Sequence, residues 1–352
     1  NATDTNGDII IGAVTGANNN LTLDTTTTTG SADNTFTGDI NLGSGALNVT
    51  GDVVLAANVS VTATPGSGVG IRFNDAVNAD NASSNDRTLT LNAGTSSSIQ
   101  VTGTVGNSQA LAGLTVTQST GTNFSSTVDV SDTNSGTITL TDTTDGGNIV
   151  FNAVTADTFT TAAQGYDIFL LGNATFANAV TFQNTGTLDL GNATSDTLTF
   201  NGGLTENTTG NVTIDGAIVS SDDAISFGNI LIGTNLSMTS AGGAISIGTI
   251  SPAFGSQDIT ITSSGGSANT VAVGAIGGSG NINTVAITSG TLTTLNGNIT
   301  TNNTSGNSVT LVGTTTNGAN ITIDTNNTSN DGAINIASFS SSNNNLALDS
   351  GT

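Results

Sequence analysis

Residues 89–130 read LTLNAGTSSSIQVTGTVGNSQALAGLTVTQSTGTNFSSTVDV and contain the pattern that decides the fold. Leu89-Thr90-Leu91 and Leu114-Thr115-Val116 each place two apolar residues on either side of a threonine. Alternation with a period of two predicts a strand that buries one of its faces. Glycine, asparagine and serine, which favour tight turns, lie between the units. The stretch therefore predicts short strands joined by turns.

The same unit recurs from one end of the chain to the other, about every 10–14 residues, a spacing typical of repeated short strands. Further examples are Leu21-Thr22-Leu23, Ile138-Thr139-Leu140, Leu188-Asp189-Leu190, Val212-Thr213-Ile214, Ile259-Thr260-Ile261, Ile321-Thr322-Ile323 and Leu346-Ala347-Leu348. No linker, charge block or change of composition interrupts the pattern. We therefore expect residues 1–352 to form one continuous repeat array.

Composition favours one β architecture over the others. Lysine is absent and glutamate occurs once, so strong helix formers are scarce, while Thr, Asn, Ser and Gly dominate. Sandwich domains normally use aromatic core anchors, and this chain of 352 residues has only 12 Phe and 1 Tyr. Stacked Val, Ile, Leu and Ala suit the narrow core of a solenoid. We predict an all-β fold, a single elongated parallel β-helix of about 12–16 coils, roughly 60–75 Å long at ~4.8 Å per coil.

The charge balance excludes several classes of function. The chain has 25 acidic residues against 2 arginines, giving a net charge of −23, and it has neither His nor Cys. Such a chain cannot neutralise a row of phosphates, so we expect no nucleic-acid partner. Zinc, haem and thiol chemistry lack their usual ligands. No apolar run approaches the ~18 residues of a membrane span, so we expect no membrane insertion.

A family resemblance points to the same fold. The stretch 89–130, together with GDIIIGAVTGANNNLTLD (7–24) and GLTENTTGNVTIDGAI (203–218), resembles the repeats of large bacterial surface proteins of the filamentous-haemagglutinin type and of autotransporter passengers. This resemblance implies a right-handed parallel β-helix that is secreted and adhesive. The near-absence of lysine and arginine also suits an extracellular location, because trypsin-like proteases find only two cleavage positions.

Calcium is the one cofactor that the sequence suggests, and none is required. The series Asp-Thr-Asn-Gly-Asp at the start of the chain spaces oxygen ligands like a calcium loop, although Ile9 stands where such a loop has glycine. A second cluster has the form Asp-Thr-Thr-Asp-Gly-Gly. Turn formation is the alternative role of both. The calcium candidates are Asp4, Asn6, Asp8, Asp142 and Asp145.

The segment 70–88 combines both signs of charge. We expect it to be a longer loop between coils that either carries surface ion pairs or makes specific contacts, for example with surface glycans. Its charged residues are Arg72, Asp75, Asp80, Asp86 and Arg87.

Catalysis has one candidate, the pair Asp222-Asp223. Neighbouring aspartates are the acid and base of some β-helix glycosidases, which also use His and Lys or Arg motifs that are missing around this pair. A solvated turn is the simpler interpretation, so we expect no enzyme. Neither end of the sequence reads as a solenoid cap, so we expect the 352 residues either to be cut from a longer rod or to stack end to end on neighbouring copies. The expected function is therefore a structural or adhesive fibre, stalk or coat whose partners are copies of itself, joined head to tail or laterally. A glycan-binding module and a carbohydrate-active enzyme are the alternatives.

Overall fold

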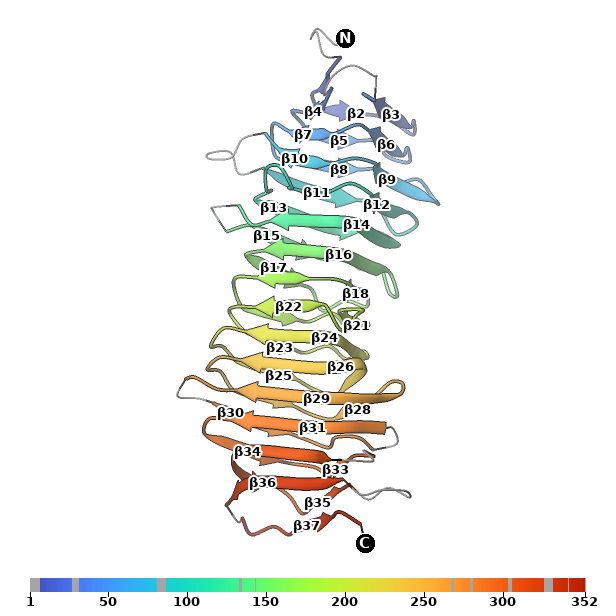
Figure 1. The fold of residues 1–352 in the computed structure, drawn as a ribbon. Helices are drawn as coiled ribbons and strands as arrows, with labels where there is room; N and C mark the ends of the chain where they lie inside the picture. Colours follow the sequence, from blue (N-terminus) through green and yellow to red (C-terminus); the bar gives the residue numbers. More distant parts are fainter. Residues whose placement is uncertain are drawn as a thin grey trace. The chain divides into compact units, whose positions relative to one another are not determined.

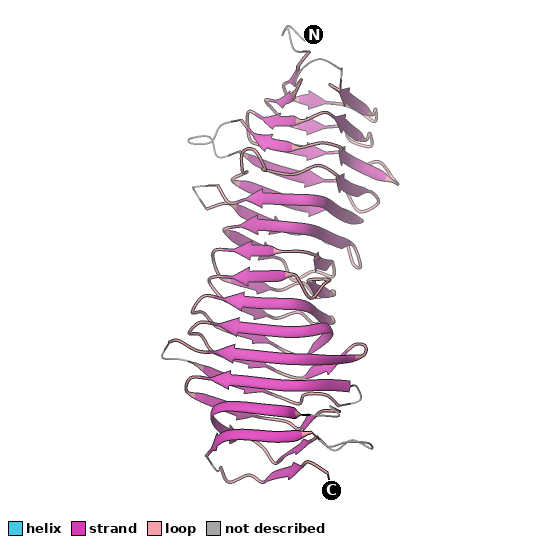
Figure 2. Cartoon of the chain, in the orientation of Figure 1, coloured by secondary structure: helices cyan, strands magenta, loops and turns pink. Residues whose placement is uncertain are grey.

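The computed structural model describes residues 7–26, 32–80, 87–132, 135–142, 144–266, 269–278, 281–302, 306–325, 332–340 and 342–351. These residues form strands, turns and bends without any helix, as Figure 2 shows. Among them no helix could serve as a membrane span. The chain divides into two compact units, unit 1 (1–177 and 183–187) and unit 2 (178–182 and 188–352).

Unit 1 contains the first nineteen strands. They are β1 (Ile9–Ile11), β2 (Val14–Thr15), β3 (Leu21–Asp24), β4 (Asn34–Phe36), β5 (Ile40–Asn41), β6 (Leu47–Thr50), β7 (Val53–Leu55), β8 (Val59–Thr62), β9 (Val69–Phe73), β10 (Val77–Ala79), β11 (Thr88–Asn92), β12 (Ser98–Val101), β13 (Gly113–Gln118), β14 (Gly121–Val130), β15 (Thr137–Leu140), β16 (Asn148–Ala156), β17 (Thr158–Thr161), β18 (Asp167–Leu170) and β19 (Ala174–Phe176).

Unit 2 contains the remaining eighteen. They are β20 (Val180–Phe182), β21 (Leu188–Leu190), β22 (Thr197–Phe200), β23 (Leu204–Glu206), β24 (Val212–Ser220), β25 (Ile225–Phe227), β26 (Ile230–Ser240), β27 (Ile245–Ile247), β28 (Ile250–Pro252), β29 (Ser256–Ser263), β30 (Thr270–Val273), β31 (Asn281–Ser289), β32 (Leu292–Leu295), β33 (Ile299–Thr300), β34 (Asn307–Asn317), β35 (Ile321–Asp324), β36 (Ala333–Phe339) and β37 (Leu346–Asp349).

In both units every strand pairs in parallel with strands one coil away (Figure 1). In unit 1, for example, β12 pairs with β14 and β14 with β16, while in unit 2 β24 pairs with β26 and β26 with β29. Strands that return in parallel after each turn define a β-solenoid, here of about 13 coils. The predicted all-β parallel solenoid is confirmed.

The alternation read from the sequence sets which side chains form the core. In β15 the burial alternates strictly: Ile138 and Leu140 are buried, whereas Thr137 and Thr139 are partly exposed. Unit 1 adds an aromatic column, in which Phe124 stacks on Phe151 with ring centroids 4.8 Å apart and planes 11° apart. The ring of Phe159 lies edge-on to that of Phe151, with centroids 6.0 Å apart. The Phe159 centroid is in turn 5.0 Å from that of Phe176. Four of the chain's aromatic residues are therefore stacked in one column of the core.

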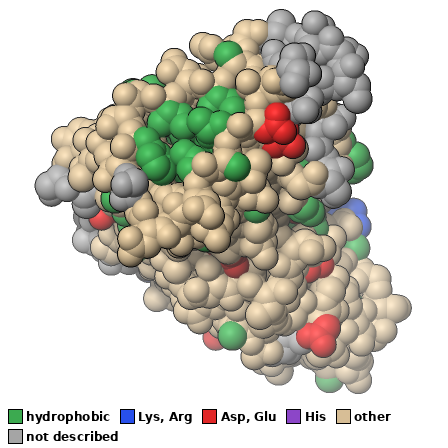
Figure 3. Space-filling model, turned by 90° about the horizontal axis from the view of Figure 1, so that it is seen from below, with side chains coloured by type: hydrophobic (Ala, Val, Ile, Leu, Met, Phe, Trp, Pro, Cys, Tyr) green, Lys and Arg blue, Asp and Glu red, His purple; other side chains and the backbone are tan. Residues whose placement is uncertain are grey.

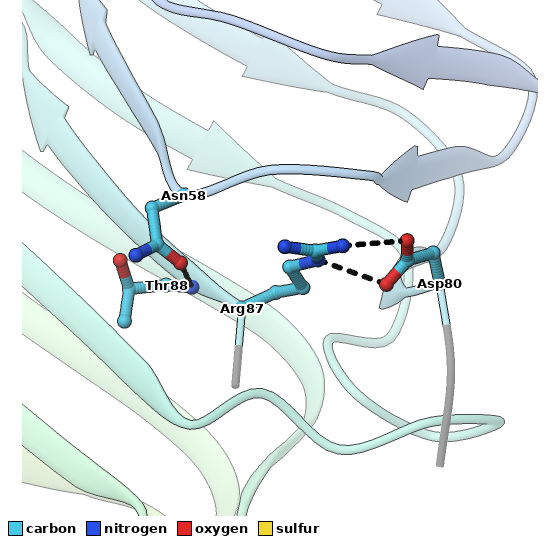
Figure 4. Close-up of polar contacts among 4 residues, drawn as sticks. All are labelled: Asn58, Asp80, Arg87 and Thr88. Atoms are coloured by element: carbon cyan, nitrogen blue, oxygen red, sulfur yellow. Dashed lines mark hydrogen bonds and ion pairs between the residues drawn. The ribbon is translucent and has the colours of Figure 1, made fainter. Parts of the chain in front are cut away.

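Hydrogen bonds from backbone N–H groups to Asn and Asp side chains also join successive coils. Asn58 Oδ1 accepts the Thr88 backbone N–H at 3.1 Å (Figure 4), and Asp39 Oδ1 accepts that of Ser60 at 2.8 Å. The same bond recurs at Asp8, Asn20, Asp52, Asn78, Asp167, Asn229, Asn235, Asn298 and Asn320. These side chains satisfy backbone donors that the parallel ladder leaves unpaired at turns.

Some corners require a residue without a side chain. A Cβ at Gly136 would overlap the carbonyl group of Val130, so only glycine fits this turn. At Gly66 the same atom would meet open space. Glycine is therefore a packing requirement at some turns and not at others.

Candidate functional site

One outward face of unit 1 carries two hollows. The first has a volume of about 520 Å³ and extends over β12, β14 and β16, with Gln100, Asn123 and Asn148 in its lining. The second, of about 470 Å³, extends over β6 and β9 and is lined by Asn48, Asn74, Arg72 and apolar neighbours.

The two hollows are adjacent because their strands pair. In the parallel register of β9 and β12, Val69 lies beside Ser98 and Arg72 beside Gln100. Val69 and Arg72 line the second hollow, and Ser98 and Gln100 line the first. We call this continuous surface, from Asn48 in β6 to Val150 in β16, the amide groove. The sequence alone does not reveal these amide residues as a group, because their alignment depends on the register between coils.

The two arginines have different surroundings. Arg87 Nε and Nη2 donate to the two carboxylate oxygens of Asp80, each at 2.9 Å (Figure 4), and these bonds raise the pKa of Arg87. Arg72 lies in β9, between Asn48 and Gln100 of the adjoining coils. In the described part of the chain Arg72 forms no ion pair. The structure therefore separates the two cations that the sequence placed in one segment.

The segment 70–88 is not a single long loop. Ile71 and Phe73 of β9 and Val77 and Ala79 of β10 are buried, because the period-two alternation continues through this segment. Asp75 lies in the turn between these strands, and its Oδ2 accepts the Gly51 N–H at 2.7 Å. Asp86 lies outside the described residues, as do the others from 81 to 86.

Asp142 is fully buried below the amide groove. Its Oδ1 accepts Gln118 Nε2 at 2.8 Å and the Thr144 N–H at 2.9 Å. Its Oδ2 accepts the Ser119 hydroxyl at 2.8 Å, and Ser119 is 2.9 Å from the Thr122 hydroxyl, which belongs to the lining of the groove. Asp142 is therefore held by three protein donors, as a buried carboxylate must be.

The other calcium candidates are dispersed. Asp145 is exposed, and Asp8 uses Oδ1 to accept the Asp33 N–H at 3.0 Å. Asp4 and Asn6 lie outside the described residues. Among the residues that are described, no three acidic side chains gather as metal ligands would.

Asp222 and Asp223 occupy an exposed corner of unit 2. The backbone carbonyl of Asp223 accepts the hydroxyls of Ser220 at 2.6 Å and Ser240 at 3.0 Å. These serines, with Ser263 and Ser289, form a buried column in register. The pair has therefore a clear backbone role at a corner of the solenoid.

The coil formed by β36 and β37 leaves core positions of unit 2 open. Ile334 and Ile336 align with the buried Val309 and Leu311, but they remain half-exposed. Similarly, Leu348 aligns with the fully buried Ile323, yet 54% of Leu348 is exposed.

Phe339 at the end of β36 is 38% exposed. In Figure 3, which views the molecule from the side of this coil, hydrophobic side chains gather in one patch. We call Ile334, Ile336, Phe339, Leu346 and Leu348 the end face.

The first described coil of unit 1 has a similar opening. Ile9 and Ile11 of β1 are half-exposed, although they align with the buried Asn34 and Phe36 of β4. Asp33 lies next to this coil. Burial and the nearby carboxylates of Asp52 and Asp8 raise the pKa of Asp33.

No protein-family model, curated protein or solved structure gave a significant match to this chain.

Proposed function

We propose that the protein is a secreted, non-catalytic structural or adhesive β-solenoid whose copies stack head to tail into a cell-surface fibre, stalk or coat. The parallel stacking of coils in both units is the observation that carries this proposal, because each coil covers the core of the next. The end face of unit 2 shows what such a coil offers to a following one: half-exposed core residues on strands, β36 and β37, that are paired on one side only within the described residues.

A parallel coil of the same kind is the natural complement of such a face. It would pair with the free edge of each strand and cover the apolar side chains in one step. The occupant that we propose is the first coil of a second copy, where Ile9 and Ile11 offer a matching apolar row. Joining two different faces is a heterologous contact, which repeats without closing and gives a filament.

Composition and resemblance support the extracellular location. The surface is rich in Thr and Asn, has no lysine, and contains two arginines as tryptic sites. The repeats resemble those of secreted filamentous-haemagglutinin-type proteins. A solenoid with a structural or adhesive role needs no catalytic group.

Charge controls how readily the copies join. Each copy carries a net charge of −23, so electrostatic repulsion opposes association. Salt weakens this repulsion, because the Debye screening length is about 10 Å at 0.1 M. Asp8 belongs to the coil that would form the joint. It is also one of the calcium candidates of the sequence, and calcium bound there would reduce the repulsion.

Electron microscopy of the purified protein, with and without a calcium chelator, tests the proposal. We expect filaments with a regular axial repeat, and their shortening by the chelator would place calcium at the joints. Discrete particles at every protein and salt concentration would refute head-to-tail stacking.

A further inference from the structure

We propose that the amide groove of unit 1 binds a glycan chain that carries a carboxylate group, and that Arg72 recognises this carboxylate. The inference concerns unit 1 alone and does not depend on filament formation. The two hollows, of about 520 and 470 Å³, form one surface that extends over β6, β9, β12, β14 and β16.

Amide side chains give this surface the chemistry that sugars require. Asn48, Arg72, Gln100 and Asn123 follow one another in register on successive strands, and Asn148 lies on the next strand. A primary amide offers both a donor and an acceptor, and a sugar hydroxyl needs both. Amides repeated at the coil spacing of ~4.8 Å can therefore contact successive sugars of an extended chain.

Apolar side chains complete the lining. Val69, Val150 and Leu171 are half-buried and border the hollows, and Phe169 stands beside Val150 in the register of β16 and β18. Such surfaces cover the C–H faces of a sugar ring, so a ligand is held by both polar and apolar contacts.

Arg72 decides the class of glycan. Only two residues of the chain are cationic, and Arg87 is occupied by a bidentate bond to Asp80. Arg72 has no ion pair in the part of the chain that the structure describes, and it stands in the second hollow. A guanidinium pairs best with a planar oxyanion such as a carboxylate, in two parallel hydrogen bonds.

The wall of the first hollow is fixed from below. Asp142 is fully buried, and it holds the Ser119 hydroxyl at 2.8 Å, which in turn contacts the Thr122 hydroxyl at 2.9 Å. Thr122 lines the hollow. Thr122 is itself buried, so this network holds the β14 backbone beneath the hollow in place before any ligand arrives.

An array of uronate- and sialate-containing glycans, printed beside their carboxyl-reduced counterparts, tests the proposal. The wild-type protein is compared with Arg72→Gln and with the matched control Arg87→Gln, and circular dichroism verifies that both variants retain the fold. We expect carboxylated glycans to bind and their reduced counterparts to bind roughly tenfold to hundredfold more weakly, because reduction removes the charge-assisted hydrogen bonds to Arg72. Arg72→Gln should remove this preference, whereas Arg87→Gln should leave it unchanged.

A second variant, Asn123→Ala, distinguishes the contribution of the amide side chains to binding from that of the Arg72 charge. It should weaken binding of carboxylated and reduced glycans alike, because it removes a hydroxyl contact. The proposal is overturned if no carboxylated glycan binds, if reduced glycans bind equally well, or if binding survives Arg72→Gln unchanged. Filament formation by each variant is measured separately, so a failure of this inference is distinct from a failure of head-to-tail stacking.

Discussion

Replacing Phe339 and Leu348 together by serine should weaken head-to-tail association without weakening the fold. Both side chains belong to the end face and are already substantially exposed in the single copy, 38% for Phe339 and 54% for Leu348. Their removal therefore costs little folding energy, but it deletes apolar surface that a second copy would cover.

The size of the effect follows from these exposed fractions. Full burial of a Leu or Phe side chain contributes about 1.5–3 kcal/mol. Scaled by the 54% and 38% that remain open, the two side chains would contribute about 1.4–2.8 kcal/mol to each joint. The concentration at which filaments form should rise by roughly tenfold to a hundredfold.

Light scattering against protein concentration, with electron microscopy of the same samples, measures this threshold. The matched control replaces Phe254 and Leu231 by serine. These residues of unit 2 lie outside the end face and are 79% and 37% exposed. This control removes at least as much exposed apolar surface, yet it should leave the threshold unchanged. Equal thresholds for the end-face variant and the wild type would refute the stated role of the end face. A raised threshold for the control as well would indicate non-specific hydrophobic association.

Three further predictions concern stability. Phe151→Ala should lower the free energy of unfolding in urea by about 3–5 kcal/mol, because it empties the centre of the aromatic column. Gly136→Ala should destabilise by more than about 1 kcal/mol in the same assay, since its Cβ has no space, whereas Gly66→Ala should not. Asp33→Asn should raise the melting temperature at pH 7 and reduce its dependence on pH.

The sign for Asp33 follows from its raised pKa. Since the folded state disfavours the charged form, the contribution of Asp33 to stability is fully present below its ordinary pKa of 3.8 and is lost as pH rises through the higher folded value. Asp24 is the opposite case, because hydrogen bonds from the Thr26 side chain and backbone lower its pKa. Asp24→Asn should therefore not stabilise the protein at pH 7. Melting curves from pH 4 to pH 7 in which Asp33→Asn follows the wild type would contradict this reasoning.

The period-two pattern of the sequence was sufficient to predict the fold class. Units such as Ile138-Thr139-Leu140 impose a period of two, and the structure buries their apolar members in parallel coils. The pattern is local, and each coil repeats it, so no long-range information was needed to predict stacked strands.

Which residues meet on the surface depends on the register between coils, which becomes known only in the folded chain. Gln100 pairs with Asn123, 23 residues ahead, and with Arg72, 28 residues back. Because the turns differ in length from coil to coil, the register cannot be counted along the chain. The amide groove was therefore invisible in the sequence.

The burial of polar residues likewise depends on the tertiary structure. Asp142 has calcium-like spacing in the sequence, but the fold encloses its carboxylate with Gln118, Ser119 and Thr144 as donors. Spacing along the chain describes one coil, whereas Gln118 and Ser119 come from the coil before it. The period of the sequence thus determined the stacked coils, and the unequal turns between them determined which side chains the stack brings together.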